Sequence, residues 1–215
     1  MNKLQAFATL LKKPDRLKAL LSYGHKGYLA KIGWFKSFDN RQAMDESGEP
    51  LPWVTYSFID FIKTRLDKEM KIFEFGSGSS TLYYAKRVKR VLSVEHDEAW
   101  YNKIVKDKPE NAEMIFSKLE RGGAYCKKAI DSGEKFDVII VDGRDRVNCC
   151  KNSIAALAPA GVIVLDDSHR ANYEEAGIFL KEAGFKEISF TGIAPGLFYL
   201  KATSVFYKPE NCLQI

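Results

Sequence analysis

Residues 71–81 read KIFEFGSGSST, and this stretch decides the fold class of the chain. A short, mostly apolar run such as 71–75 is typical of a buried parallel strand. Gly76 and Gly78 then allow a sharp turn and a close approach of the backbone to a ligand, and Ser79 or Ser80 can cap a following helix. A strand, a glycine-rich turn and a helix in this order predict a nucleotide-type binding loop.

The same alternation continues along the chain. Apolar runs at 90–95, 112–116, 136–141 and 161–165 predict four further strands, and helical periodicity fills 81–88, 98–105, 124–131 and 147–157 between them. This order predicts an α/β fold, a doubly wound and mostly parallel sheet of about seven strands. After a helix at 173–183, strand segments at 185–190, 197–200 and 204–207 predict a closing antiparallel hairpin.

The chain divides into two parts. Residues 1–52 predict an N-terminal helical extension, with two short amphipathic helices on either side of Pro14 and an irregular, lid-like segment rich in Gly and Pro at 24–52. Residues 53–215 predict one Rossmann-like domain that opens with a helix at 53–66.

The net charge of +5 is unevenly distributed. Residues 1–36 hold eight basic residues against Asp15, a net +7, so the remainder carries −2. The basic leader is either a solvated face or a contact for an anionic partner such as a membrane surface, whereas the core does not favour nucleic acid. The four cysteines show no C-x-x-C spacing and no apolar run is long enough for a membrane span, which together predict a cytoplasmic protein with reduced thiols.

Two acidic residues, one before the glycine turn and one at the end of the next strand, indicate which kind of ligand binds there. Glu95 ends the second predicted strand, 19 residues after Gly76, where a carboxylate can accept hydrogen bonds from both hydroxyls of a ribose. Glu74, directly before the turn, sits poorly beside a pyrophosphate but suits a ligand with a cationic ammonium and sulfonium.

With these residues in place, 71–208 resembles a class I S-adenosylmethionine-dependent methyltransferase. Glu74, Gly76 and Gly78 match the first motif of that family, Glu95 matches its ribose-binding acid, and Asp142 matches the acid that ends its fourth strand. The resemblance implies S-adenosylmethionine as cofactor. It also brings the remaining residues of the turn and the neighbour of Glu95 to the cofactor: Ser77, Ser79, Ser80 and His96. Ser80 departs from the family, which often has a third glycine there.

A second group of polar residues follows the fourth and fifth predicted strands. Because parallel strands end at one edge of the sheet, we expect Asp142, Asp166, Asp167 and His169 to face one crevice. The arrangement is similar to the metal-dependent catechol O-methyltransferases, which implies magnesium on the three aspartates. Asp167 stands where asparagine is usual in that type, and no lysine follows Asp142 at the general-base position. The alternative is that the aspartates cap loops or contact the cofactor.

The chemical step is assigned to the same group. His169 titrates near working pH and is expected to remove the acceptor proton, while Asp142 positions the reactants. His169 is alternatively a surface loop residue, and Asp145 is the alternative base.

The acceptor is expected to be a small molecule or a glycan that offers an oxygen, because the segment after strand four lacks the Asn/Asp-Pro-Pro-Tyr pattern of nucleobase methylation. Arg144, Arg146 and Arg170 can hold a carboxylate or phosphate of the acceptor, or they are solvated. Two other functions stay open: a nicotinamide-dependent oxidoreductase and a non-catalytic binding module with a methyltransferase-like fold.

Overall fold

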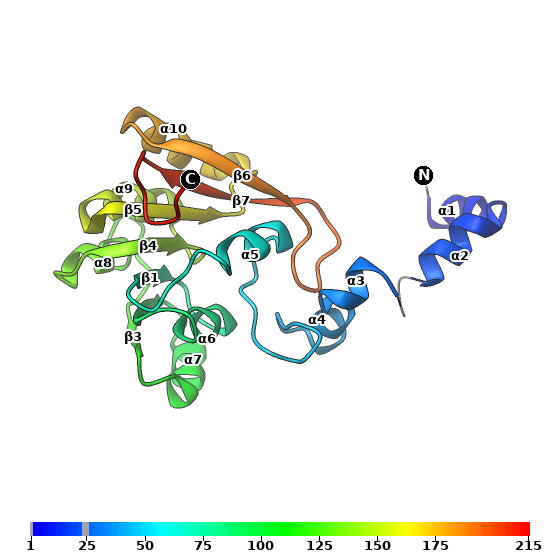
Figure 1. Ribbon diagram of the computed structural model, residues 1–215, viewed down its shortest axis with the longest axis horizontal. Coiled ribbons are helices and arrows are strands. Elements are labelled where there is room, and N and C mark those ends of the chain that lie inside the picture. The colour runs from blue at the N-terminus through cyan, green and yellow to red at the C-terminus, as the bar shows by residue number, and fades with distance from the viewer. Residues whose placement is uncertain (1, 23–25) are drawn as a thin grey trace.

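A computed structural model describes residues 2–22 and 26–215. Its centre is a seven-stranded sheet in the order β3-β2-β1-β4-β5-β7-β6 (Figure 1). The strands are β1 Lys71–Phe75, β2 Arg90–Glu95, β3 Ala112–Phe116, β4 Phe136–Val141, β5 Leu157–Asp166, β6 Lys186–Gly192 and β7 Lys201–Tyr207.

Strands β1 to β5 run parallel, and β7 lies antiparallel between β5 and β6. The predicted fold class is therefore confirmed, including the closing antiparallel pair. The first four strands have the predicted bounds, whereas β5 begins at Leu157 rather than 161 and β7 begins at Lys201 rather than 204. Residues 197–200 belong to the loop between β6 and β7, so the strand expected there was wrong. The strand order reverses between β1 and β4, which is where ligands bind in open α/β sheets.

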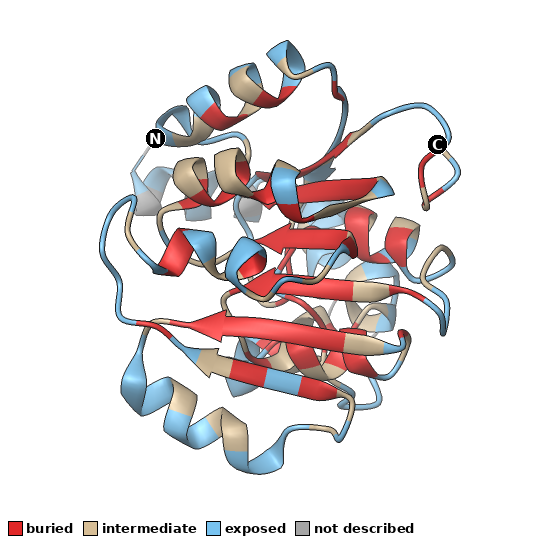
Figure 2. Ribbon diagram, turned by 90° about the vertical axis from the view of Figure 1, so that its left-hand side faces the viewer, coloured by how far each residue is buried: buried red, intermediate tan, exposed pale blue. Residues whose placement is uncertain are grey.

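Helices cover both faces of the sheet, and the central strands are buried along most of their length (Figure 2). The helices are α1 Lys3–Leu11, α2 Pro14–Ser22, α3 Tyr28–Lys31, α4 Trp34–Asn40, α5 Tyr56–Ile62, α6 Ser79–Ala85, α7 Glu98–Ile104, α8 Lys128–Asp131, α9 Arg146–Ser153 and α10 Glu174–Glu182. Successive side chains of a strand point to opposite faces, so Ile72 packs with α5 and α6 while Phe73 and Phe75 pack with α8, α9 and α10.

The N-terminal region contains more regular structure than expected. Helices α1 and α2 form around Pro14 as predicted, pack on each other, and lie to one side of the sheet (Figure 1). Residues 23–25 lie outside the described part of the chain. The remainder of the lid-like segment is not irregular throughout, because it contains α3 and α4. Trp34 Nε1 donates a hydrogen bond to the carbonyl of Leu197 at 2.8 Å, which ties this segment to the β6–β7 loop.

None of the helices in the described ranges combines the length and apolar character needed to span a bilayer.

Candidate active site

A cavity of about 380 Å³ opens at the carboxyl edge of the parallel strands, where the loops after β1, β2, β4 and β5 meet. Eight residues predicted from the sequence line it: Glu74, Gly76, Ser77, Ser80, Glu95, His96, Asp142 and Asp167. Gly78 and Ser79 lie at the start of α6, and Asp166 is buried and does not line the cavity. The volume is in the range of small-molecule and cofactor sites.

The glycine turn has the backbone that only glycine adopts without strain. Gly76 has φ +100° and Gly78 has φ +149°. A Cβ on Gly76 would lie 3.3 Å from the backbone of Gly143, so the loops after β1 and β4 pack directly on each other. The cap of α6 differs from the prediction, because it comes from neither Ser79 nor Ser80. Thr81 Oγ1 accepts the N–H of Gly78 at 3.1 Å instead.

Glu74 is a buried carboxyl group that receives hydrogen bonds on one oxygen. Its Oε2 accepts from Thr81 Oγ1 at 2.6 Å and from Ser93 Oγ at 3.0 Å. Burial raises the pKa of Glu74 from 4.5 to about 7, although these hydroxyls favour the ionised form. The group is therefore close to losing its proton at neutral pH, and a cation in the cavity would complete that ionisation.

Glu95 is buried and held in a fixed orientation by the backbone that follows it. Its Oε1 accepts the N–H groups of His96 at 2.7 Å and Asp97 at 2.9 Å, and its Oε2 accepts from Ser77 Oγ at 3.0 Å. A carboxylate has about four lone-pair directions. Three are used here, so Glu95 has acceptor capacity left for a ligand hydroxyl in the cavity.

The three aspartates come together as predicted, but around side-chain cations. Arg146 lies 2.9 Å from Asp142 and 3.5 Å from both Asp166 and Asp167. Lys201, from the start of β7, lies 2.8 Å from Asp166 and 3.2 Å from Asp167. Burial works against a charged Lys201, yet the carboxylates of Asp166 and Asp142 outweigh it and raise the pKa of the ammonium group.

These contacts do not fit the expected magnesium site. A metal ion needs carboxylate oxygens that are free to coordinate it, and here Arg146 and Lys201 already provide the positive charge. Within the described ranges, no group of three or more acidic, histidine or cysteine side chains has an arrangement suited to a metal ion. The sequence did not reveal Lys201, because its position depends on the pairing of β5 with β7.

Asp142 stands between this charge network and the cavity. Its Oδ1 accepts from Arg146 Nη2 at 2.9 Å, while the side chain remains 24% exposed. Burial, and after it the neighbouring carboxylate of Asp166, raise the pKa of Asp142, against the opposing effect of Arg146 and Lys201. Asp142 therefore belongs both to the ion-pair network and to the lining of the cavity.

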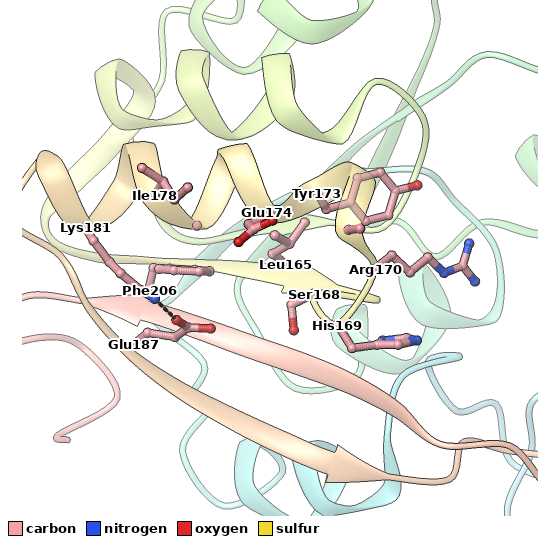
Figure 3. A pocket seen from close by; sticks show the side chains of 12 residues that line it. Leu165, Ser168, His169, Arg170, Tyr173, Glu174, Ile178, Lys181, Glu187 and Phe206 are labelled. Carbon is pink, nitrogen blue, oxygen red and sulfur yellow. Dashed lines mark ion pairs between the residues drawn. The ribbon is translucent and has the colours of Figure 1, made fainter.

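His169 lies elsewhere, and the expectation that it shares a crevice with Asp142 is corrected. The chain turns at Asp167, whose φ is +55°, and carries His169 into a separate cavity of about 430 Å³ between α10 and β7 (Figure 3). There His169 Nδ1 accepts the backbone N–H of Ala202 at 3.1 Å. In the neutral ring this leaves the proton on Nε2, so no free nitrogen lone pair remains for a base.

Two residues that shape the site, Tyr125 and Trp100, belong to no motif that the sequence showed. Tyr125 covers Gly143 so closely that a Cβ on that glycine would lie 2.1 Å from the phenol oxygen. Trp100 Nε1 donates to the carbonyl of Ser77 at 3.0 Å and fixes the glycine turn from α7. Both contacts join residues that are more than ten positions apart, so local sequence patterns could not have predicted them.

Comparison with solved structures identifies the fold. Precorrin-6y C5,15-methyltransferase from Geobacter metallireducens superimposes with a TM-score of 0.56 at 14% identity, over 80% of this chain and 96% of that one. The O-methyltransferase TomG from Streptomyces achromogenes, in complex with SAM, gives 0.54 at 15% identity over 89% and 95%. The N-methyltransferase NodS from Bradyrhizobium japonicum, in complex with S-adenosyl-L-homocysteine, gives 0.52 at 17% identity over 71% and 85%.

The chain therefore has the fold of the class I S-adenosylmethionine-dependent methyltransferases. No model of a protein family matches the sequence, and no curated protein matches it either.

Proposed function

We propose that the protein transfers a methyl group from S-adenosylmethionine to an oxygen of a small-molecule or glycan acceptor. One observation carries the proposal: a single cavity, at the point where the strand order reverses between β1 and β4, is lined by the buried acids Glu74 and Glu95 and by Asp142. Structural neighbours that bind S-adenosylmethionine or its product support it.

Glu95 and Glu74 bind different parts of the cofactor. Glu95, held by two backbone N–H groups, uses its remaining acceptor direction for a hydrogen bond from a ribose hydroxyl. Glu74, whose pKa of about 7 falls when a cation approaches, binds the ammonium group. A pyrophosphate beside Glu74 would meet a negative charge, which disfavours the alternative of a nicotinamide cofactor.

The bound cofactor supplies an electrophilic methyl group on a positively charged sulfur. The acceptor oxygen forms a bond to that methyl carbon while the carbon–sulfur bond breaks, and the electron pair of the broken bond stays on sulfur. The acceptor proton passes to Asp142, which replaces His169 as the proposed base. Alignment of oxygen, carbon and sulfur supplies much of the rate enhancement.

Calorimetry on the full chain tests the proposal. S-adenosylhomocysteine should bind, and NADH should not. Glu95→Gln should weaken binding about 10- to 150-fold, because charge-assisted hydrogen bonds contribute about 1.5–3 kcal/mol. Glu98→Gln, an exposed change on α7, is the matched control. Equal affinity in Glu95→Gln would place the ribose elsewhere, and an absence of all cofactor binding would favour the non-catalytic module.

A further inference from the structure

A second cavity, of about 570 Å³, lies beside the cofactor cavity at the same edge of the sheet. The two cavities share Arg144 and Arg146 in their walls, so a molecule in one borders a molecule in the other. No residue of the glycine turn reaches this second cavity. It is therefore placed to take the partner of the reaction rather than the cofactor.

The lining of this cavity holds more positive than negative side chains. Arg121 and Arg144 line it, both are exposed, and neither forms an ion pair with any residue in the described ranges. The acid in the wall, Asp145, forms no ion pair with either arginine: its Oδ2 accepts the N–H of Gly122 at 2.8 Å and its Oδ1 accepts from Asn148 at 2.8 Å.

The other nearby cations already form ion pairs with acidic residues, unlike Arg121 and Arg144. Arg146 is held by the three aspartates, and Arg170 pairs with Asp167 at 2.9 Å. Glu175, the acid whose pKa Arg121 helps to lower, pairs with Lys151 at 2.6 Å. Two guanidinium groups thus face the cavity without a carboxylate of their own, and guanidinium groups bind carboxylates and phosphates in bidentate geometry.

Apolar side chains complete the wall. Leu119, Val147 and the ring of Tyr173 line the same cavity as the two arginines. A site with apolar sides and a few placed polar groups binds a small organic molecule by its body and orients it by its charge.

We propose that the methyl acceptor is an anionic small molecule, whose carboxylate or phosphate group binds Arg121 and Arg144 and whose apolar body lies on Leu119, Val147 and Tyr173. This inference rests on the proposed function and specifies its substrate class. The acceptor hydroxyl then points toward the shared wall and the cofactor cavity, and its proton is lost to Asp142 as the bond to the methyl carbon forms.

The test uses the full chain saturated with S-adenosylhomocysteine and two probes of similar size, phenyl phosphate and neutral benzyl alcohol. Calorimetry should show phenyl phosphate binding that weakens as salt is added, and binding of benzyl alcohol at least tenfold weaker. Arg121→Gln and Arg144→Gln should each weaken phenyl phosphate binding about tenfold or more. Arg16→Gln, which removes the same charge from α2, should change nothing.

The outcomes separate this inference from the proposed function. If S-adenosylhomocysteine binds but phenyl phosphate does not, or binds the double variant Arg121→Gln/Arg144→Gln equally well, the anionic acceptor is refuted and the methyltransferase assignment stands. Equal affinity for the two probes also refutes it. If phenyl phosphate binds while S-adenosylhomocysteine does not, the methyltransferase assignment fails, and the acceptor role of the cavity fails with it.

Discussion

Glu74→Gln should make the protein more stable at alkaline pH while impairing its site. The glutamine oxygen can accept the same two hydroxyl groups, from Thr81 and Ser93, that now donate to Oε2. The substitution therefore removes the ionisable group and keeps its hydrogen bonds. Any change in stability then reports the cost of a buried negative charge.

The size of the effect follows from the pKa of Glu74. A rise from 4.5 to about 7 on folding corresponds to about 3 kcal/mol, at ~1.4 kcal/mol per pH unit. Below pH 4.5 the carboxyl is protonated in both the folded and the unfolded chain, so it costs nothing. Between pH 4.5 and 7 the unfolded chain ionises first and stability falls, and above pH 7 the full cost is present.

Urea unfolding at pH 5, 6, 7 and 8 measures this directly. The free energy of unfolding of Glu74→Gln should exceed that of the parent by about 3 kcal/mol at pH 8, with most of the difference gained between pH 5 and 7. Glu98→Gln, exposed on α7, should show no such trend. A difference that is constant with pH, or a less stable variant at pH 8, would refute the reasoning.

The pH dependence of cofactor affinity is an independent measure of the ionisation of Glu74. An ammonium group binds the ionised carboxylate, so the affinity of the parent for S-adenosylhomocysteine should rise from pH 5 to 7 and then level off. The variant should bind more weakly, with little dependence on pH in this range. A parent affinity that falls over this range would place the ammonium group elsewhere.

Gly143→Ala should destabilise the fold by about 1–3 kcal/mol through overpacking against Tyr125, and Tyr125→Phe should recover part of this in urea unfolding; an unaffected Gly143→Ala would show that the loop yields. Lys201→Met should cost about 3 kcal/mol, because it removes one of the two cations beside the buried Asp166 and leaves Arg146 alone there, with partial recovery on adding Asp166→Asn; equal losses in both variants would deny the coupling. Magnesium and chelators should leave the thermal midpoint unchanged, because side-chain cations already face the aspartates; a shift of several degrees on adding magnesium would restore the metal site. Vesicles with phosphatidylserine should co-sediment with the chain, and Lys12→Gln/Lys13→Gln should weaken this about 30-fold, at about 1 kcal/mol per charge; binding unaffected by the change would leave the basic leader as a solvated face.

Sequence patterns predicted the sheet well where strands are buried on both faces. The strands β1, β2 and β4 have the expected bounds, since a parallel strand covered by helices needs a nearly continuous apolar run. The edge strand β3 also has its expected bounds, although Glu113 and Phe116 are exposed. The cavity was predictable for a related reason: Glu74, Glu95 and Asp142 each sit at the carboxyl end of such a strand. Once strand ends are known, parallel topology places these residues at one edge.

Features that depend on distant contacts were not predictable. The strand segment at 197–200 was wrong because exposed Phe198 and Leu200 have strand propensity without a strand partner. Helix α4 was missed because its stability depends on packing, including the bond from Trp34 to the β6–β7 loop. The position of His169 depends on one left-handed residue before it, and the composition of the loop does not show which way such a turn goes.

The position of β7 has a consequence for the order of folding. Asp166 lies opposite Thr203 in the pairing of β5 with β7, and Lys201 enters the site from the same strand. A folding chain that has formed only the parallel strands holds two buried carboxylates without this ammonium group. Long-range antiparallel pairing with the last strand is slow compared with the local βα units. Refolding should therefore produce the binding-competent site only when the sheet itself is finished.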